Sequence, residues 1–159
     1  MLRNLWHHFL LITRHRHKVI AHCKKAGILW QGLRHDLSKY SPTEFIPGVK
    51  YYQGNRSPNA AEKEEKGYSA AWLHHKGRNK HHFEYWIDFA PDKSWGLVGN
   101  KMPLRYLIEM VMDRIAASKV YKGKDYTDAC AWEYFERGRD FVVMHPRTTS
   151  QLEYLLTML

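Results

Sequence analysis

A histidine and an aspartate stand side by side in this chain at His35-Asp36, and Lys39 follows three residues after the aspartate. Neutral imidazole and carboxylate groups together suit divalent transition metals such as zinc, iron, manganese, cobalt and nickel. Further histidines cluster in one short window of the sequence, at His74, His75, His81 and His82. These residue types at this spacing predict a site for one or two divalent transition-metal ions.

The helical phase of the N-terminal segment selects another histidine that should point inward. Ile12 and Val19 belong to the apolar face of the predicted helix, and His15 lies three residues after the first and four before the second. His15 is therefore expected to face the core, whereas His17 lies roughly 200° away around the helix and should face solvent. The alternatives for the first metal ligand are His7, His8, His17 and His22.

A carboxylate in apolar company marks the helix predicted to start after Pro103. Asp113 directly follows Met112 and lies two residues before Ile115. Burying a carboxylate is costly unless a cation or hydrogen-bond donors accompany it, and a metal ion would offset that cost. The alternative is an ordinary surface ion pair between Asp113 and Arg105, Arg114 or a lysine.

The composition indicates one globular domain with a basic N-terminal part. The 159 residues are 44% hydrophobic and 14% aromatic, which is enough for a sizeable core. The net charge is +9, and residues 1–40 hold eight lysines and arginines against one acidic residue. Such a surface would attract a small anionic phosphate substrate or a nucleic-acid backbone, although a merely solvated helix face is the alternative.

Cysteine usage and hydropathy bear on the location of the protein. Cys23 and Cys130 both lie in apolar helical patterns, which favours reduced thiols in a cytoplasmic protein over a disulfide framework. The apolar start of the chain is too short to cross a membrane, so we expect no membrane partner. The sequence does not specify the oligomeric state.

Strand-like alternation is scarce, so an all-α fold with a single domain over residues 1–159 is expected. Ser41-Pro42-Thr43-Glu44 has the form of a capping box, and Thr127 is a predicted N-cap. Gly77 and Asn79 should break the helix before the histidine window. Helices are expected over 2–13 and 14–26, with or without a break between them, then from 42, over 60–76, 103–120 and 127–139, and after 146.

The ligand types and their order resemble those of the HD-domain superfamily, which contains metal-dependent phosphohydrolases. His15, the pair His35-Asp36 and Asp113 follow the order His, His-Asp, Asp. The whole chain also resembles a family of small uncharacterised bacterial and phage proteins, which brings no activity with it. That second resemblance rests on Trp30-Gln31-Gly32-Leu33, Lys39-Tyr40-Ser41-Pro42-Thr43-Glu44-Phe45 and His81-His82-Phe83-Glu84-Tyr85-Trp86.

The superfamily resemblance implies an HD-like helical bundle and roles for particular residues. A first ion would be held by His15, His35, Asp36 and Asp113. A second ion would share Asp36 and add His75 and His82, although pairing His74 with His81 fits the spacing equally well. Lys39 and His81 would be catalytic, His74 would orient the ligands, and the substrate phosphate would be contacted by Lys39, Arg34 and Arg78.

The predicted ligands and the superfamily resemblance together indicate a metal-dependent hydrolase of a small phosphate ester, with nucleotides among the candidate substrates. A metal-activated water would be the nucleophile. One alternative keeps the fold and changes the chemistry, because HD-fold relatives with two irons are oxygenases. Another is a basic module that binds nucleic acid or phosphate without catalysis and holds a structural metal.

Overall fold

The computed structural model describes residues 2–159, and it is built mainly of helices, which confirms the predicted all-α class. The α-helices are α1 (Leu2–Lys25), α2 (Leu29–Arg34), α3 (Pro42–Lys50), α4 (Pro58–Lys66), α5 (Ala70–Lys76), α6 (Leu104–Lys122), α7 (Cys130–Gly138) and α8 (Pro146–Thr157). Short 3-10 segments lie between them at Leu37–Tyr40, Phe83–Trp86, Lys93–Trp95, Gly123–Asp125 and Arg139–Phe141. Two short strands are β1 (Ile87–Phe89) and β2 (Leu97–Gly99).

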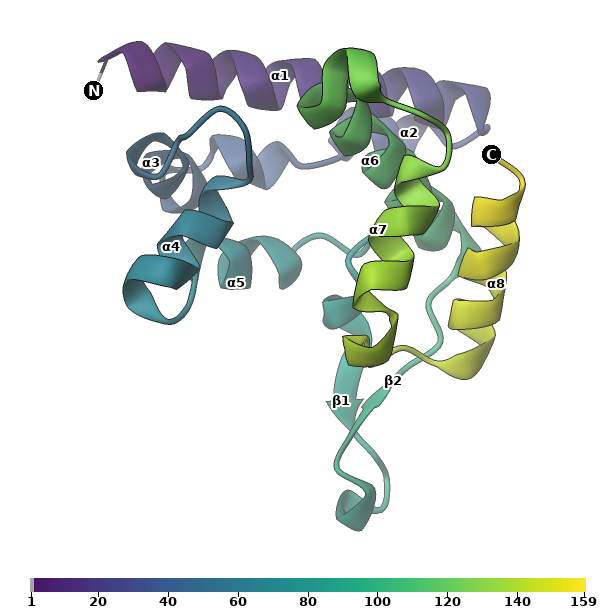
Figure 1. The fold of residues 1–159 in the computed structure, drawn as a ribbon. Helices are drawn as coiled ribbons and strands as arrows, with labels where there is room; N and C mark the ends of the chain where they lie inside the picture. Colours follow the sequence, from purple (N-terminus) through teal and green to yellow (C-terminus); the bar gives the residue numbers. More distant parts are fainter. Residues whose placement is uncertain (1) are drawn as a thin grey trace.

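Helix α6 lies between α1 and the C-terminal helices α7 and α8 (Figure 1). Helix α1 packs against α6 and α2, and α7 and α8 pack against α6 and against each other. Helices α3, α4 and α5 form a second group, joined to α1 through α3. The main core combines α6 with the C-terminal helices, and its most buried members include Leu107, Val111, Phe135 and Leu152.

Helix α1 is continuous, so the predicted segments 2–13 and 14–26 form one element that ends at Lys25. Its buried positions repeat at helical spacing and include Ile12, His15, Val19 and Cys23. Helix α2 can approach this face closely because Gly32 has no side chain. A Cβ at position 32 would lie 2.7 Å from Cβ of Cys23.

Two predicted helix boundaries are wrong. The single helix expected over 60–76 is divided into α4 and α5, because Gly67 leaves the helical conformation with a φ of +80°. The helix expected from Thr127 begins at Cys130, with Ala129 at the N-cap. The hydroxyl of Thr127 lies 3.5 Å from Sγ of Cys130 and does not cap the helix.

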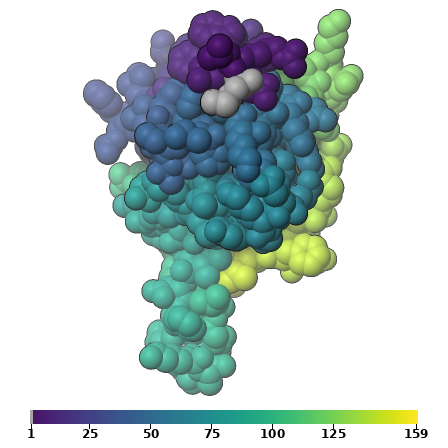
Figure 2. Space-filling view, turned by 90° about the vertical axis from the view of Figure 1, so that its left-hand side faces the viewer, coloured from purple at the N-terminus to yellow at the C-terminus, as the bar shows by residue number. Residues whose placement is uncertain are grey.

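Strands β1 and β2 pair antiparallel, with Ile87 opposite Gly99 and Phe89 opposite Leu97. The hairpin extends away from the helices as an arm, which the space-filling view also shows (Figure 2). No strand was expected in this part of the chain, since three-residue strands are too short to show an alternating pattern. Within residues 2–159, no helix has both the length and the hydropathy needed to cross a membrane.

Candidate metal centre

A first group of side chains brings together residues from α1, the turn after α2, and α6. His15, His35, Asp36 and Asp113 each offer one ligand atom, and these atoms all lie within 4.8 Å of one another. Nε2 of His15 is 2.9 Å from Oδ1 of Asp113, and Nε2 of His35 is 3.2 Å from Oδ2 of Asp36. The structure thus gathers the four residues that the sequence assigned to the first ion.

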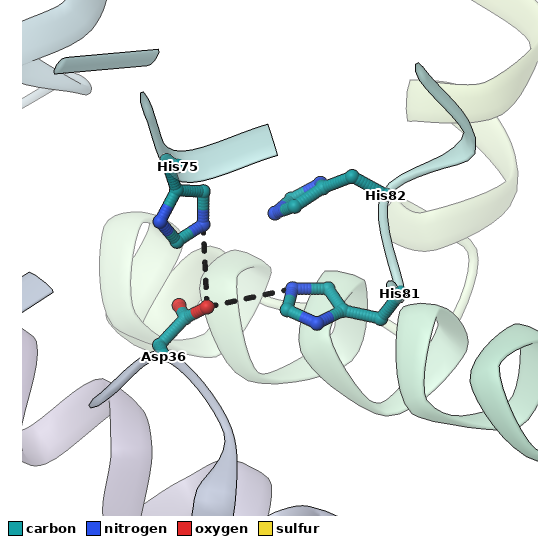
Figure 3. A group of neighbouring side chains, drawn as sticks. All are labelled: Asp36, His75, His81 and His82. Carbon is teal, nitrogen blue, oxygen red and sulfur yellow. Dashed lines mark ion pairs between the residues drawn. The ribbon is translucent and has the colours of Figure 1, made fainter. Parts of the chain in front are cut away.

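A second group lies on the other side of Asp36 and consists of Asp36, His75, His81 and His82 (Figure 3). Oδ1 of Asp36 lies 3.2 Å from Nε2 of His75 and 3.5 Å from Nε2 of His81. His82 points into the same space as the other two rings. The sequence assigned His75 and His82 to this group, and the structure adds His81 to them.

Asp36 belongs to both groups because its two carboxylate oxygens face different histidines. Oδ2 faces His35 at 3.2 Å, and Oδ1 faces His75 at the same distance. Asp36 is also the one non-glycine residue of the described chain with a positive φ, +53°. Such a backbone conformation costs roughly 1–2 kcal/mol for an L-residue and persists where the surrounding structure requires it.

Hydrogen bonds to the backbone hold the turn that carries His35 and Asp36. Arg16 of α1 donates through Nε to the carbonyl oxygen of His35 and through Nη2 to that of Leu33, each at 2.8 Å. On the opposite side, Nδ2 of Asn79 donates to Oγ of Ser38 and to the carbonyl oxygen of His75, each at 2.9 Å. Asn79 therefore links the end of α5 to the turn containing Asp36.

Helix α5 is positioned by its first residues, which places His75 toward Asp36. Oγ of Ser69 accepts a hydrogen bond from the backbone N–H of Trp72 at 3.0 Å and donates one to Glu62 at 2.6 Å. Ser69 is therefore an N-cap that is itself fixed by a buried carboxylate. The helix ends at Lys76, as the sequence predicted from Gly77 and Asn79.

Several atoms that face the centre are buried and have no partner in hydrogen-bonding geometry, although some partners lie close by. They are Nε2 of His15, His35, His81 and His82, and both carboxylate oxygens of Asp36. Unsatisfied buried polar atoms are rare in folded proteins, so their concentration in one place marks a candidate binding site. A nitrogen and oxygen donor set that converges in this way fits one or two divalent transition-metal ions.

Two glutamates, Glu109 and Glu44, hold the outer nitrogens of the histidine rings. Oε1 of Glu109 lies 3.0 Å from Nδ1 of His35 and 3.1 Å from Nδ1 of His81. Oε2 of Glu44 lies 2.7 Å from Nδ1 of His75. Carboxylates that accept a hydrogen bond from Nδ1 orient the ring and leave Nε2 for a metal, an arrangement common in metalloproteins.

Neither glutamate was predicted from the sequence to belong to the site. Glu44 was interpreted as part of a capping box, but the side chain of Ser41 makes no capping bond, and Glu44 turns instead toward His75 and His74. Glu109 could have been found from helical phase, since it lies four residues before Asp113 and so shares its face of α6. Its apolar neighbours Met110 and Val111 give the same signal of a buried carboxylate.

The ionisation of the centre follows from burial and from the charges around it. Burial alone would raise the pKa of Asp36, but the charges of His35 and Lys39 hold this pKa well below its usual value. For His35, burial alone would lower the pKa, but the charge of Asp36 and neighbouring hydrogen bonds raise it well above 6.5. Burial, together with the charges of His81 and His75, lowers the pKa of His82 well below 6.5.

The residues predicted to bind substrate or to orient the ligands lie outside the two groups. Nζ of Lys39 lies 2.7 Å from Oδ2 of Asp36, at the wall of the cavity described below. His74 is outside both groups, with Nδ1 2.7 Å from Oε1 of Glu44, from where it can help to orient that carboxylate. Arg34 and Arg78 are exposed and do not line the cavity, so the geometry gives them no contact with the site.

The alternatives for the first ligand also lie elsewhere. His7 and His17 are exposed, as predicted for His17. His22 lies 3.4 Å from Nζ of Lys119. His8 is buried against Phe45 and belongs to neither group of ligand atoms. Among the N-terminal histidines, His15 is the one that the structure brings to the centre.

Both groups open into one cavity of about 470 Å³. His15, Asp113, His75, His81 and His82 line it together with Lys39. Its remaining wall combines aliphatic and polar residues with four aromatic side chains, Trp72, Phe83, Tyr121 and Tyr134. The space is large enough for a small organic ligand beside the ligand atoms.

Comparison with known proteins gives a family but no activity. No curated protein and no solved structure matches the chain. A family model described as "Family of unknown function (DUF5662)" matches residues 4–158. The match covers nearly the whole chain, and the protein therefore belongs to the DUF5662 family.

Proposed function

We propose that this protein is a metal-dependent hydrolase of a small phosphate ester, in which ions at the shared Asp36 activate the attacking water. The observation that carries the proposal is the position of Asp36 between two groups of unpartnered Nε2 atoms. The same residues support the proposed membership of the HD-domain superfamily. His15, His35, Asp36 and Asp113 have the ligand order of HD-domain proteins, and they converge.

The side chains around the ions would each have a defined task. Ions bound here would supply an activated water and neutralise charge on the phosphoryl group. Asp36 belongs to both groups and would hold the ions, while Glu109 and Glu44 fix the histidine rings. Lys39 lines the cavity beside Asp36, where its ammonium group can contact a phosphate oxygen.

The charge of the loaded centre favours an anionic substrate. Two divalent ions carry four positive charges, and four carboxylates surround them, those of Asp36, Asp113, Glu44 and Glu109. The sum is zero, and the ammonium group of Lys39 makes it positive. A cavity with this balance attracts a phosphate ester more strongly than a neutral substrate.

The test combines elemental analysis with a broad panel of substrates. Protein purified without a metal-affinity tag should contain a transition metal, and with added manganese, cobalt or iron it should release phosphate from a nucleotide or phosphometabolite. Asp36→Asn should abolish both metal content and turnover. Asp88→Asn, which changes an exposed aspartate of the hairpin, is the matched control. A metal-free wild-type protein, or turnover that survives Asp36→Asn, would refute the proposal.

An oxygenase is the second candidate, because the centre contains five histidines and such a set also suits a pair of iron ions. Oxygen consumption by the iron-loaded protein, without phosphate release from any ester, would favour it. Nucleic-acid binding is a third candidate function, because α1 carries exposed basic residues at Arg14, Lys18, Lys24 and Lys25. Salt-dependent DNA binding without turnover would favour that module.

A further inference from the structure

The wall of the cavity carries two charged side chains, Arg114 and Glu84, and each has a buried atom that lacks a hydrogen-bond partner within the described residues. Nη1 of Arg114 and Oε2 of Glu84 are both buried and make no hydrogen bond. Glu84 is near enough for its charge to act on Arg114, yet the two do not form an ion pair. A donor group and an acceptor group therefore border the same cavity, and each lacks a counterpart.

Such an arrangement is costly unless a ligand completes it. Burying a guanidinium or a carboxylate without full hydrogen bonding is unfavourable. A ligand bound in the cavity would supply the missing hydrogen bonds to both groups. A second anionic group would suit Arg114 but would be repelled by Glu84. A neutral group that presents a donor and an acceptor side by side would satisfy both.

The surrounding wall favours a flat ligand. The guanidinium of Arg114 lies 5.4 Å from the ring centroid of Tyr134. Phe83, Trp72 and Tyr121 line the same cavity. Aromatic side chains and arginine planes are the usual stacking partners of nucleobases, whose edges also carry adjacent hydrogen-bond donors and acceptors.

We propose that the substrate is a nucleotide and that Glu84 and Arg114 bind the edge of its base while the phosphate lies at the metal centre. Glu84 accepts a hydrogen bond from an N–H of the base, and Arg114 donates one to a ring nitrogen or carbonyl oxygen. This inference rests on the proposed hydrolase function, because it places the phosphate by that function. It makes Glu84 and Arg114 specificity residues outside the set of metal ligands.

The experiment compares substrates with and without a base in the manganese-loaded protein. Wild-type kcat/KM should be at least tenfold higher for the best of AMP, GMP, CMP and UMP than for ribose 5-phosphate. Arg114→Gln and Glu84→Gln should each lower the nucleotide value by about tenfold or more, the loss expected for a hydrogen bond to a charged group. Turnover of ribose 5-phosphate should fall far less than turnover of the nucleotide, and circular dichroism should show that the variants fold. Arg137→Gln and Glu133→Gln are matched controls at exposed positions of α7.

Binding of nucleosides separates this inference from the proposed function. Calorimetry with adenosine, guanosine, cytidine and uridine on the metal-loaded protein needs no hydrolysis. Nucleoside binding that Arg114→Gln and Glu84→Gln weaken, without phosphate release from any ester, would keep the base site and overturn the hydrolase. Equal kcat/KM for nucleotides and ribose 5-phosphate in all variants would overturn the base site and keep the hydrolase. Loss of ribose 5-phosphate turnover in a folded Arg114→Gln variant would show that Arg114 binds phosphate, which also overturns the inference.

Discussion

Nε2 of His15 and Oδ1 of Asp113 lie 2.9 Å apart, and this contact joins the first helix of the chain to α6. Helices α1 and α6 pack along each other, so the centre is built across a long-range contact of the fold. Ions at this position would therefore hold together segments that are far apart in the sequence. Binding and folding are coupled in such sites, because the unfolded chain does not contain them.

Removal of the metal should lower the thermal stability. An ion that binds the folded chain at a concentration 100 to 1,000 times its Kd would raise the melting temperature by roughly 5–15 °C in a chain of this size. Dialysis against a chelator, followed by calorimetry with and without added manganese, measures this shift. A melting temperature that does not respond to either treatment would contradict a centre joining α1 to α6.

The shared position of Asp36 predicts how metal content responds to single substitutions. Asp36→Ala removes an oxygen ligand from both groups and should lower the metal content by more than His82→Ala, which affects the second group alone. His35→Ala should lose most of the first ion. His17→Ala, at an exposed position of α1, should change nothing. Metal content unchanged in both Asp36→Ala and His35→Ala would refute the site.

Residue type, helical phase and the resemblance to HD-domain proteins together predicted which side chains converge in the first group. His15 was selected because it shares a face with Ile12 and Val19, and Asp113 because it interrupts an apolar helix. The second group could not be resolved in this way. His81 and His82 lie in an irregular turn after α5 has ended, where no periodicity relates side-chain direction to sequence position. Only the tertiary structure shows that both rings approach Asp36.

The helix boundaries, too, could be predicted only in part. The start of α8 at Pro146 follows from proline at the first helical position. The division between α4 and α5 at Gly67 was missed, because a single glycine within a helical pattern is often tolerated. Glu44 fits the sequence pattern of a capping box, and the sequence alone favoured that local interpretation. In the structure the side chain of Ser41 makes no capping bond, and the carboxylate of Glu44 lies beside His75.

Glu109 should be a positioning residue for both groups. Its Oε1 atom contacts Nδ1 of His35 and of His81, one ring from each group. Substitution of such an outer carboxylate typically lowers metal affinity by about 10- to 100-fold. We expect Glu109→Ala to weaken metal binding within that range, with circular dichroism unchanged, in a competition titration against a chelating dye. Glu136→Ala on the exposed face of α7 is the control, and equal affinities in both variants would contradict this role.

His8 should make the stability of the protein depend on pH. Burial and the charge of Lys39 lower the pKa of this histidine from 6.5 to about 4. As the pH falls below 6.5, the unfolded chain takes up a proton that the folded chain does not, so stability falls until the pH reaches about 4. In chelator-treated protein, His8→Gln should reduce this dependence, as measured by urea denaturation at several pH values. His7→Gln, at an exposed neighbouring position, should leave the slope as it is. A slope that both variants share with the wild type would exclude His8 as its source.

Lys39 should affect turnover more than metal binding. Its Nζ atom lies 2.7 Å from Oδ2 of Asp36 and borders the cavity, so an ion at Asp36 and a phosphate in the cavity would both be within its reach. Burial alone would lower the pKa of Lys39, but the charges of Asp36 and Asp113 raise it, and the group stays protonated at neutral pH. A cation that meets the phosphoryl oxygens mainly in the transition state contributes to kcat.

We therefore expect Lys39→Ala to lower phosphate release by about 100-fold, the effect of removing one preorganised donor, while metal content stays at the wild-type level. Phosphate release and elemental analysis on the same preparation measure both quantities. Lys18→Ala removes an exposed lysine of α1 and should leave both unchanged. If metal content falls together with the rate, Lys39 acts by stabilising the charge of Asp36, and the phosphate must be bound by another group.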